Sequence, residues 1–130
     1  MYASNHHRNI LSKGDSITNS KAVSEARSTA ENIQAGIDGK VFEINEMYPA
    51  YIAVATSQSE KGTEVSFTWA FEAEKIHAGL YQKAKQAVDE EEDVDLGPIQ
   101  ICSVSGYTVE GAAPERCPIC KALKGQFGQF

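Results

Sequence analysis

The chain has 130 residues, with 18 acidic and 12 basic side chains, and 42% of its residues are apolar. This composition is typical of a folded domain, or of two small ones, and not of a disordered chain. The net charge of −6 argues against general nucleic-acid binding, which needs clustered bases. No apolar stretch approaches the roughly 20 residues of a membrane span.

The charge and the cysteines are both local. Six acids lie between Asp89 and Asp95, which leaves 12 acids against 12 bases elsewhere. Residues 1–11 carry no apolar segment of a secretory signal. We therefore expect a cytoplasmic protein, where clustered cysteines bind metal more often than they form disulfides. Three cysteines, an odd number, lie in the last third of the chain: Cys102, Cys117 and Cys120.

The first long helix is predicted at about 28–61. Ser28 and Glu31 have the spacing of a capping box, and apolar residues then recur near helical period. Residues 1 to about 24 are polar and predict a short helix at about 3–12, followed by a loop.

We expect this first helix to be weakened or kinked, because it contains two glycines and a proline. Lys61-Gly62 predicts its end, with a base in the last turn and glycine after it. A second helix is predicted at about 63–88, because residues spaced three and four apart between Phe67 and Ala84 fall on one helix face. The residues that weaken the first helix are Gly36, Gly39 and Pro49.

Two long helices joined by a tight turn predict an antiparallel hairpin, whose apolar faces need further partners. We predict a partial helical domain at 1–90 and an acidic linker at 91–97, because like charges extend a chain. The remainder, 98–130, is rich in turns and has short β-like pieces at 99–103 and 107–109.

Four polar side chains on the predicted helices form a first candidate site. Glu43 and Glu46 are three apart and so share a helix face, and Glu74 and His77 have the same spacing on the next helix. Both pairs have apolar neighbours, and a buried carboxylate is costly unless it is paired or coordinated. An inward Glu-x-x-His is a ligand unit of di-iron carboxylate proteins. Solvated helical pairs are the alternative interpretation.

The cysteines form a second candidate site. Two Cys-x-x-Cys turns make a tetrahedral metal site, and Cys117-Pro118-Ile119-Cys120 is one complete turn. The other, Cys102-Ser103-Val104-Ser105, has the poorer ligand Ser105 in the second position. We expect the three thiolates to bind a metal ion, with the Ser105 oxygen, water or nothing in the fourth place. A weakened zinc knuckle and a metal-free tail are the alternatives.

These motifs resemble those of rubrerythrins. Residues 27–88 resemble the last two helices of the ferritin-like di-iron bundle, and 98–130 resemble the rubredoxin-like domain. The strongest matches are Ser28-Thr29-Ala30-Glu31-Asn32, Glu43-Ile44-Asn45-Glu46-Met47-Tyr48-Pro49, Glu74-Lys75-Ile76-His77 with Tyr81, Gly106-Tyr107-Thr108-Val109-Glu110-Gly111, Ala113-Pro114-Glu115 and Cys117-Pro118-Ile119-Cys120.

The resemblance implies a mainly α fold: a long antiparallel helical hairpin, half of a ferritin-like four-helix bundle, followed by a small rubredoxin-like domain rich in β-structure and turns. It also implies an iron-dependent peroxidase in oxidative-stress defence. Non-haem iron in a di-iron centre would reduce hydrogen peroxide to water. A mononuclear rubredoxin-type iron would pass electrons to it from a donor protein, a rubredoxin or a reductase.

The resemblance further implies roles for individual residues. Glu46, which resembles the ligand that shifts with redox state, would be catalytic together with the pocket residues Tyr51 and Tyr81. The di-iron ligands would be Glu43, Glu46, Glu74 and His77. The single iron would be held by Cys102, Cys117 and Cys120, with Ser105 beside them.

The sequence departs from the family in three ways. The motifs of the first two family helices are absent, which predicts an N-terminal truncation; Ser105 replaces an iron cysteine; and Lys121 stands where the family usually has glycine. Each family hairpin supplies one lone-Glu helix and one Glu-x-x-His helix. We therefore expect a homodimer that rebuilds the four-helix bundle around a shared di-iron site. The alternatives are a catalytically impaired remnant and a structural module that binds zinc or iron.

Overall fold

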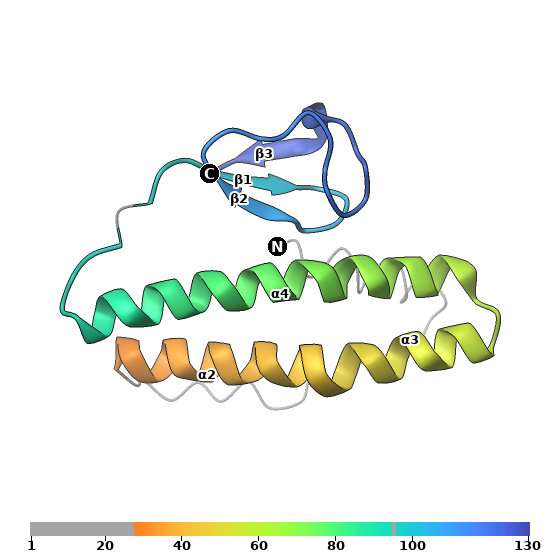
Figure 1. Cartoon of the computed structure of the whole chain (residues 1–130), viewed down its shortest axis with the longest axis horizontal. Helices are drawn as coiled ribbons and strands as arrows, with labels where there is room; N and C mark the ends of the chain where they lie inside the picture. The colour runs from red at the N-terminus through yellow and green to blue at the C-terminus, as the bar shows by residue number, and fades with distance from the viewer. Residues whose placement is uncertain (1–27, 95) are drawn as a thin grey trace.

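The computed structural model describes residues 28–94 and 96–130 (Figure 1). The first arm consists of α2 (Thr29–Phe42), η1 (Glu43–Met47) and α3 (Tyr48–Ser57), and it runs antiparallel to α4 (Lys61–Asp89). The predicted helical hairpin is confirmed. The helix predicted at about 3–12 lies outside the described residues.

The capping box predicts the start of α2 correctly. The amide of Glu31 donates to Ser28 Oγ at 3.3 Å, and the amide of Ser28 donates to Glu31 Oε2 at 2.9 Å. These bonds satisfy two groups that a helix end leaves without an internal partner.

Neither the glycines nor the proline interrupt the first arm. Gly36 and Gly39 lie within α2, and a π-helical turn precedes Pro49. In η1 the amide of Tyr48 donates to the carbonyl oxygen of Glu43, five residues back. This wider turn lets Pro49, which has no amide proton to donate, follow at the start of α3.

The π turn also changes the spacing of the two glutamates. Successive residues rotate less in a π turn than in an α-helix, so residues three apart are separated by a wider angle than the regular helical pattern assumes. Glu43 is half-buried, whereas Glu46 is exposed.

The turn of the hairpin comes earlier than Lys61-Gly62. It is formed by residues 58–60, with Ser59 at φ 59° in the left-handed region. Lys61 belongs to the first turn of α4, where its ammonium pairs with Glu64 at 3.0 Å. The prediction that the first helix ends at Lys61 is therefore wrong.

Most of the buried apolar side chains of the hairpin are small. Tyr48 and Ala55 are buried on the first arm, and Ala70, Ala73 and Ala78 on α4. Alanines let helix backbones approach closely, and the larger rings lie towards the turn end of the hairpin, where the rings of Tyr48 and Phe67 are 6.4 Å apart.

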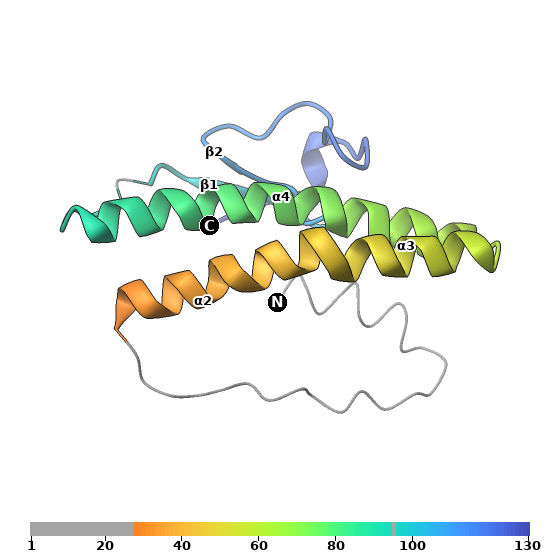
Figure 2. The same cartoon turned by 60° about the horizontal axis from the view of Figure 1, so that its bottom comes forward.

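A small sheet packs on α4, on the side opposite the first arm (Figures 1 and 2). Its strand order is β2-β1-β3, with both pairs antiparallel. Two strands were predicted from the sequence, and β3 was missed. The strands are β1 (Ile99–Cys102), β2 (Thr108–Glu110) and β3 (Phe127–Gln129), the last preceded by the short helix η2 (Lys124–Gln126).

Lys83 ties the sheet to α4, since its Nζ lies 3.0 Å from Glu110 Oε2. None of the helices in the described ranges combines the length and the apolar composition needed to cross a membrane.

Candidate metal centres

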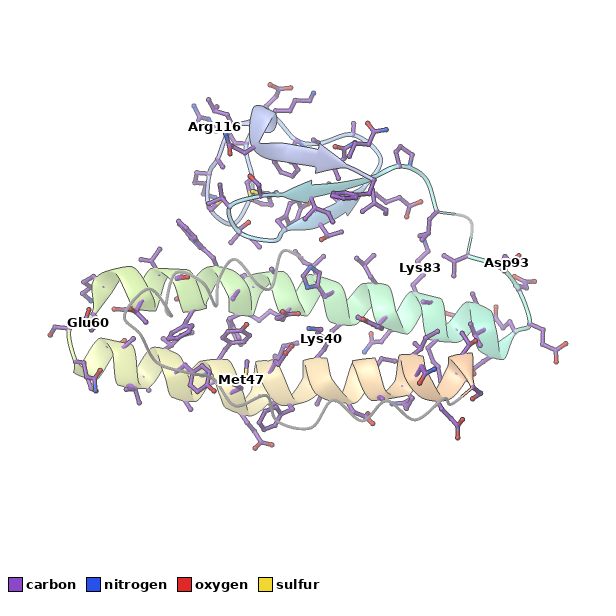
Figure 3. All side chains as sticks on the ribbon, turned by 180° about the vertical axis from the view of Figure 1, so that it is seen from behind. Lys40, Met47, Glu60, Lys83, Asp93 and Arg116 are labelled. Carbon is purple, nitrogen blue, oxygen red and sulfur yellow. The ribbon has the colours of Figure 1, made fainter. Side chains whose placement is uncertain are left out.

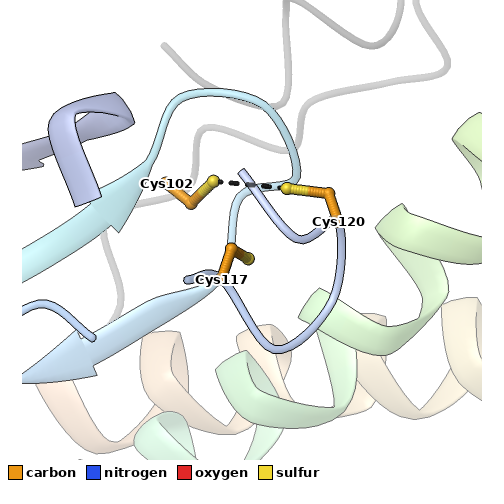
Figure 4. A group of neighbouring side chains, drawn as sticks. All are labelled: Cys102, Cys117 and Cys120. Carbon is orange, nitrogen blue, oxygen red and sulfur yellow. Dashed lines mark hydrogen bonds between the residues drawn. The ribbon is translucent and has the colours of Figure 1, made fainter. Parts of the chain in front are cut away.

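The three cysteines converge in the small domain. Their sulfur atoms all lie within 4.8 Å of one another, and Cys102 Sγ is 3.6 Å from Cys120 Sγ (Figure 4). Cys102 and Cys117 are fully buried, and all three are free thiols. This spacing fits a single metal ion, as the sequence predicts.

Two matching backbone turns present the cluster. The amide of Gly106 donates to the carbonyl oxygen of Cys102 at 2.9 Å, and the amide of Lys121 donates to that of Cys117 at 3.0 Å. Gly106 and Lys121 both have positive φ, 78° and 64°. The second turn therefore places a lysine in the conformation that glycine adopts more readily.

Ser105 occupies the remaining place beside the sulfurs. Its side chain is fully buried, and its Oγ lies 3.3 Å from Cys117 Sγ. Three thiolates and this hydroxyl fit one tetrahedral ion, with the hydroxyl as the weak member of the set.

The surroundings of Cys117 and Cys120 shift the pKa values of these two thiols in opposite directions. Burial acts to raise the pKa of Cys117, but hydrogen bonds from Ser105 and from backbone amides in the turn outweigh burial and lower it. The pKa of Cys120 is raised, first by burial and also by its neighbouring thiols. Cys117 is therefore better prepared than Cys120 to bind a cation as thiolate.

An ammonium group stands at the centre of the second cluster. Lys40 Nζ lies 2.8 Å from Glu43 Oε2 and 2.7 Å from Glu74 Oε2, and Figure 3 labels Lys40 between the two arms. Glu74 is only 8% exposed. The ammonium thus joins α2 to α4 and neutralises a buried carboxylate.

Each charge of this pair holds the other ionised. Burial favours the neutral form of both groups, but their hydrogen bonds and charges prevail. The pKa of Lys40 is raised by Glu43 and Glu74. The pKa of Glu74 is lowered by His77 and Lys40.

Tyr48 lies close to these charges. Burial, together with the negative charges of Glu74 and Glu43, raises its pKa to about 12. Its phenol therefore stays protonated near neutral pH.

His77 connects the two clusters. Its Nδ1 donates to Glu74 Oε2 at 2.9 Å, since a carboxylate can only accept. Its Nε2 lies 3.1 Å from the carbonyl oxygen of Gly106 and 3.1 Å from Thr108 Oγ1. Gly106 follows Ser105 directly, so the helical cluster and the cysteine cluster share a short covalent and hydrogen-bonded connection.

The predicted catalytic residues are more exposed than Glu74. Glu46 is exposed. Tyr51 is 47% exposed, with its ring 5.3 Å from that of Phe67. Tyr81 is 39% exposed and lies against Gly36, where an added Cβ would come within 2.6 Å of Tyr81 Cε1.

The helical cluster fits one cation rather than two within a single chain. The Lys40 ammonium shows that the oxygens of Glu43 and Glu74 can hold a positive group between them. In the described part of the chain, however, Glu43, Glu46, Glu74 and His77 are not gathered at metal-ligand spacing. A dinuclear centre would need rearrangement and additional donors.

Lys40 and Thr108 are the site residues that sequence reasoning missed. Lys40 is three residues before Glu43, a spacing that predicts an ion pair and could have been noticed. The contact between Thr108 and His77 spans 31 residues and has no local signal.

Two family models match the chain. The model described as Rubrerythrin covers residues 3–85, and the model described as Rubrerythrin, rubredoxin-like domain covers residues 100–128. The chain belongs to the rubrerythrin family. Its two candidate metal centres lie one in each of these matched regions.

Similar proteins support this membership. Rubrerythrin-2 of Clostridium acetobutylicum is 39% identical over 132 residues, a match that covers 100% of this chain and 71% of that protein. Nigerythrin of Nitratidesulfovibrio vulgaris is 33% identical, over 84% of this chain and 52% of that protein. A solved structure of fully reduced, all-ferrous nigerythrin superimposes with a TM-score of 0.80 at 27% identity, over 99% of this chain and 63% of that one. This rubrerythrin-family chain thus corresponds to part of the length of these relatives.

Proposed function

We propose that this rubrerythrin-family chain is a non-haem iron oxidoreductase that reduces hydrogen peroxide to water in oxidative-stress defence. Each peroxide takes two electrons and two protons and gives two water molecules. The electrons come from a donor protein, a rubredoxin or a reductase, and enter at the cysteine site. Iron, when bound, supplies the redox chemistry.

The observation that carries this proposal is the position of His77. One nitrogen of its ring contacts Glu74 in the helical cluster, and the other contacts the backbone beside Ser105 in the cysteine cluster. A peroxidase with two metal centres needs a short path between electron entry and peroxide reduction.

The roles of the residues follow from their donor atoms. Cys102, Cys117 and Cys120 would hold a single iron, with Ser105 beside them. After the rearrangement that their present spacing requires, Glu43, Glu46, Glu74 and His77 would hold iron in the helical cluster. Tyr51 and Tyr81 would line the peroxide pocket.

We further propose that two copies pair through the helical hairpin and complete a four-helix bundle. Aromatic and aliphatic side chains of the described hairpin are exposed, and pairing with a second copy would remove them from water. A second copy would bring the additional carboxylates and histidine that a dinuclear centre needs. The exposed side chains include Val41, Phe42, Tyr51, Val54, Val65 and Tyr81.

A cytoplasmic location suits this chemistry. The cysteines are free thiols, and thiolate sites of this kind persist in reducing compartments.

Single-turnover reoxidation tests the function. Iron-loaded protein is reduced without oxygen, mixed with hydrogen peroxide and followed by visible absorption. We expect rapid reoxidation in the wild type and a loss of at least about tenfold in Glu74→Gln, because this variant lacks a carboxylate that would hold the iron. Glu72→Gln is the matched control, because Glu72 lies on the same helix and pairs only with Lys75 at the surface. Equal rates in all three proteins would refute the proposal.

Sedimentation with metal analysis tests the dimer. We expect a dimer with iron at both kinds of site. A monomer that carries no more than one iron would refute the shared centre.

A structural zinc site is the second candidate, because only the cysteines are gathered at ligand spacing in residues 28–94 and 96–130. After aerobic iron loading, strong thiolate-to-iron charge-transfer bands favour the redox function. Exclusive zinc retention, with neither these bands nor the near-ultraviolet bands of an oxo-bridged di-iron centre, favours the structural one.

A further inference from the structure

The unusual feature of the helical cluster is a lysine placed between two carboxylates that the family resemblance assigns to iron. Lys40 Nζ contacts Glu43 Oε2 and Glu74 Oε2 at 2.8 and 2.7 Å. The side chain of Lys40 is only 21% exposed, and that of Glu74 only 11%. The contact is therefore a partly buried bridge between α2 and α4 rather than a surface ion pair.

The bridge has a clear electrostatic role in the metal-free protein. A carboxylate as buried as Glu74 needs a positive or hydrogen-bonding partner, and here it has the Lys40 ammonium and the His77 ring on the same oxygen. A divalent cation bound by Glu43 and Glu74 would meet the same need. Both cations would lie between the same two oxygen atoms, so only one of them can be present at a time.

We propose that Lys40 competes with the metal. Its ammonium bridges Glu43 and Glu74 in the metal-free protein, and it must leave before a divalent cation binds to these two carboxylates. This inference rests on the proposed iron site and deepens it. The long, flexible lysine side chain permits such an exchange, since its head is solvated readily once it is released. Lys40 thus stabilises the hairpin without metal and lowers the affinity of the Glu43–Glu74 pair for metal.

Manganese titration tests the competition directly. Mn²⁺ prefers carboxylate, carbonyl and water ligands, so the cysteine site is first filled with Zn²⁺, which binds thiolates well. The full-length chain is then titrated with Mn²⁺, and free Mn²⁺ is measured by electron paramagnetic resonance. We expect Lys40→Gln to bind Mn²⁺ at least about tenfold more tightly than the wild type, because two charge-assisted hydrogen bonds no longer oppose binding.

Two further variants locate the effect. Lys61→Gln removes a lysine that also pairs with a glutamate three residues on, Glu64, but at 76% exposure, and it should bind Mn²⁺ as the wild type does. Glu74→Gln added to Lys40→Gln should abolish the gain. If Lys40→Gln binds no more tightly than a wild type that does bind Mn²⁺, the competition is refuted and the proposed iron site remains. If no variant binds Mn²⁺, the metal assignment of the helical cluster fails as well.

A measurement on the wild type keeps the test independent of how well the variants fold. The lysines are acetylated briefly with and without Mn²⁺, and the labelled peptides are quantified by mass spectrometry. We expect Lys40 to be labelled several-fold faster when Mn²⁺ is bound, because its head moves into solvent, whereas the labelling of Lys61 stays constant. Equal or slower labelling of Lys40 with bound Mn²⁺ would overturn the proposal.

Discussion

Replacing Lys121 by glycine should stabilise the cysteine turn through the backbone alone. Lys121 has a φ of 64°, and its side chain contributes only one exposed hydrogen bond, from Nζ to the carbonyl oxygen of Pro118 at 2.8 Å. A left-handed conformation costs a non-glycine residue roughly 1–2 kcal/mol. Glycine removes this cost but loses about 0.5–1 kcal/mol of chain entropy on folding. The net gain expected for Lys121→Gly is about 0.5–1 kcal/mol.

The first cysteine turn supplies the reciprocal variant. Gly106 has a φ of 78°, and a Cβ added there would meet only Ala73 Cβ at an ordinary 3.8 Å. Gly106→Ala therefore introduces backbone strain without a steric clash, and we expect it to destabilise its turn by about 1 kcal/mol.

Thiol labelling measures both changes locally. Cys102 and Cys117 are fully buried, so an aromatic disulfide reagent reaches them in metal-free protein only when the turns open. At constant pH, we expect Lys121→Gly to slow labelling about two- to fivefold and Gly106→Ala to accelerate it about fivefold, since about 1 kcal/mol changes an opening equilibrium by that factor. Lys121→Ala is the control, because it removes the side chain and keeps the strain. If Lys121→Ala slows labelling as much as Lys121→Gly, the side chain and not the backbone is responsible, and the reasoning is refuted.

Three other predictions test different parts of the structure. Ser105→Cys should complete a four-thiolate site, because Ser105 Oγ is buried 3.3 Å from Cys117 Sγ; bound metal should then resist a chelator longer, and an unchanged release rate would contradict this. Tyr48, with a pKa of about 12 against the ordinary 10.0, should ionise late in an ultraviolet titration of metal-free protein. Because the folded pKa is the raised one, its contribution to stability is complete below pH about 10 and is lost as pH rises towards about 12; ionisation near 10 would show that the ring is not buried. Gly39→Ala should raise the free energy of unfolding by about 1 kcal/mol through helix propensity, since nothing lies within 4 Å of the added Cβ. Gly36→Ala should give no gain in the free energy of unfolding and should change the near-ultraviolet circular dichroism, because a Cβ at this position would come within 2.6 Å of Tyr81 Cε1 and push the ring away. Equal stability gains in Gly39→Ala and Gly36→Ala would contradict this contact.

The hairpin and the cysteine turns could be predicted because their signals are local. The capping box at Ser28 fixes the start of the first arm within four residues of sequence. The spacing of Cys117 and Cys120 alone implies a turn that brings two sulfurs together. Neither inference depends on how distant segments of the chain pack.

The features that the sequence did not predict are a departure from regular helix geometry and contacts between distant segments. The π turn at Glu43–Met47 arises because the helix continues past Pro49, and helical periodicity alone assumes regular turns. Strand β3 has glycine at its centre, Gly128, and it exists because the edge of β1 needs a partner. The pairing of Lys40 with Glu74 joins residues on different arms, so no spacing along the chain predicts it.

The two cysteine turns have each lost a different part of one motif, and the structure shows what each part contributes. The turn at Cys102–Gly106 keeps its glycine and lacks the second thiol, whereas the turn at Cys117–Lys121 keeps both thiols and lacks the glycine. Their backbone hydrogen bonds are nevertheless alike, at 2.9 and 3.0 Å. The fold of the turns therefore requires neither the fourth thiolate nor the glycine.

What these losses affect is the charge around the metal. A neutral hydroxyl at Ser105 in place of a thiolate leaves a bound iron with one negative ligand fewer, and fewer anionic ligands favour the reduced state. The iron would accept an electron more readily and release it less readily towards His77. Ser105→Cys should therefore lower the reduction potential of an iron bound here, as well as slow its release.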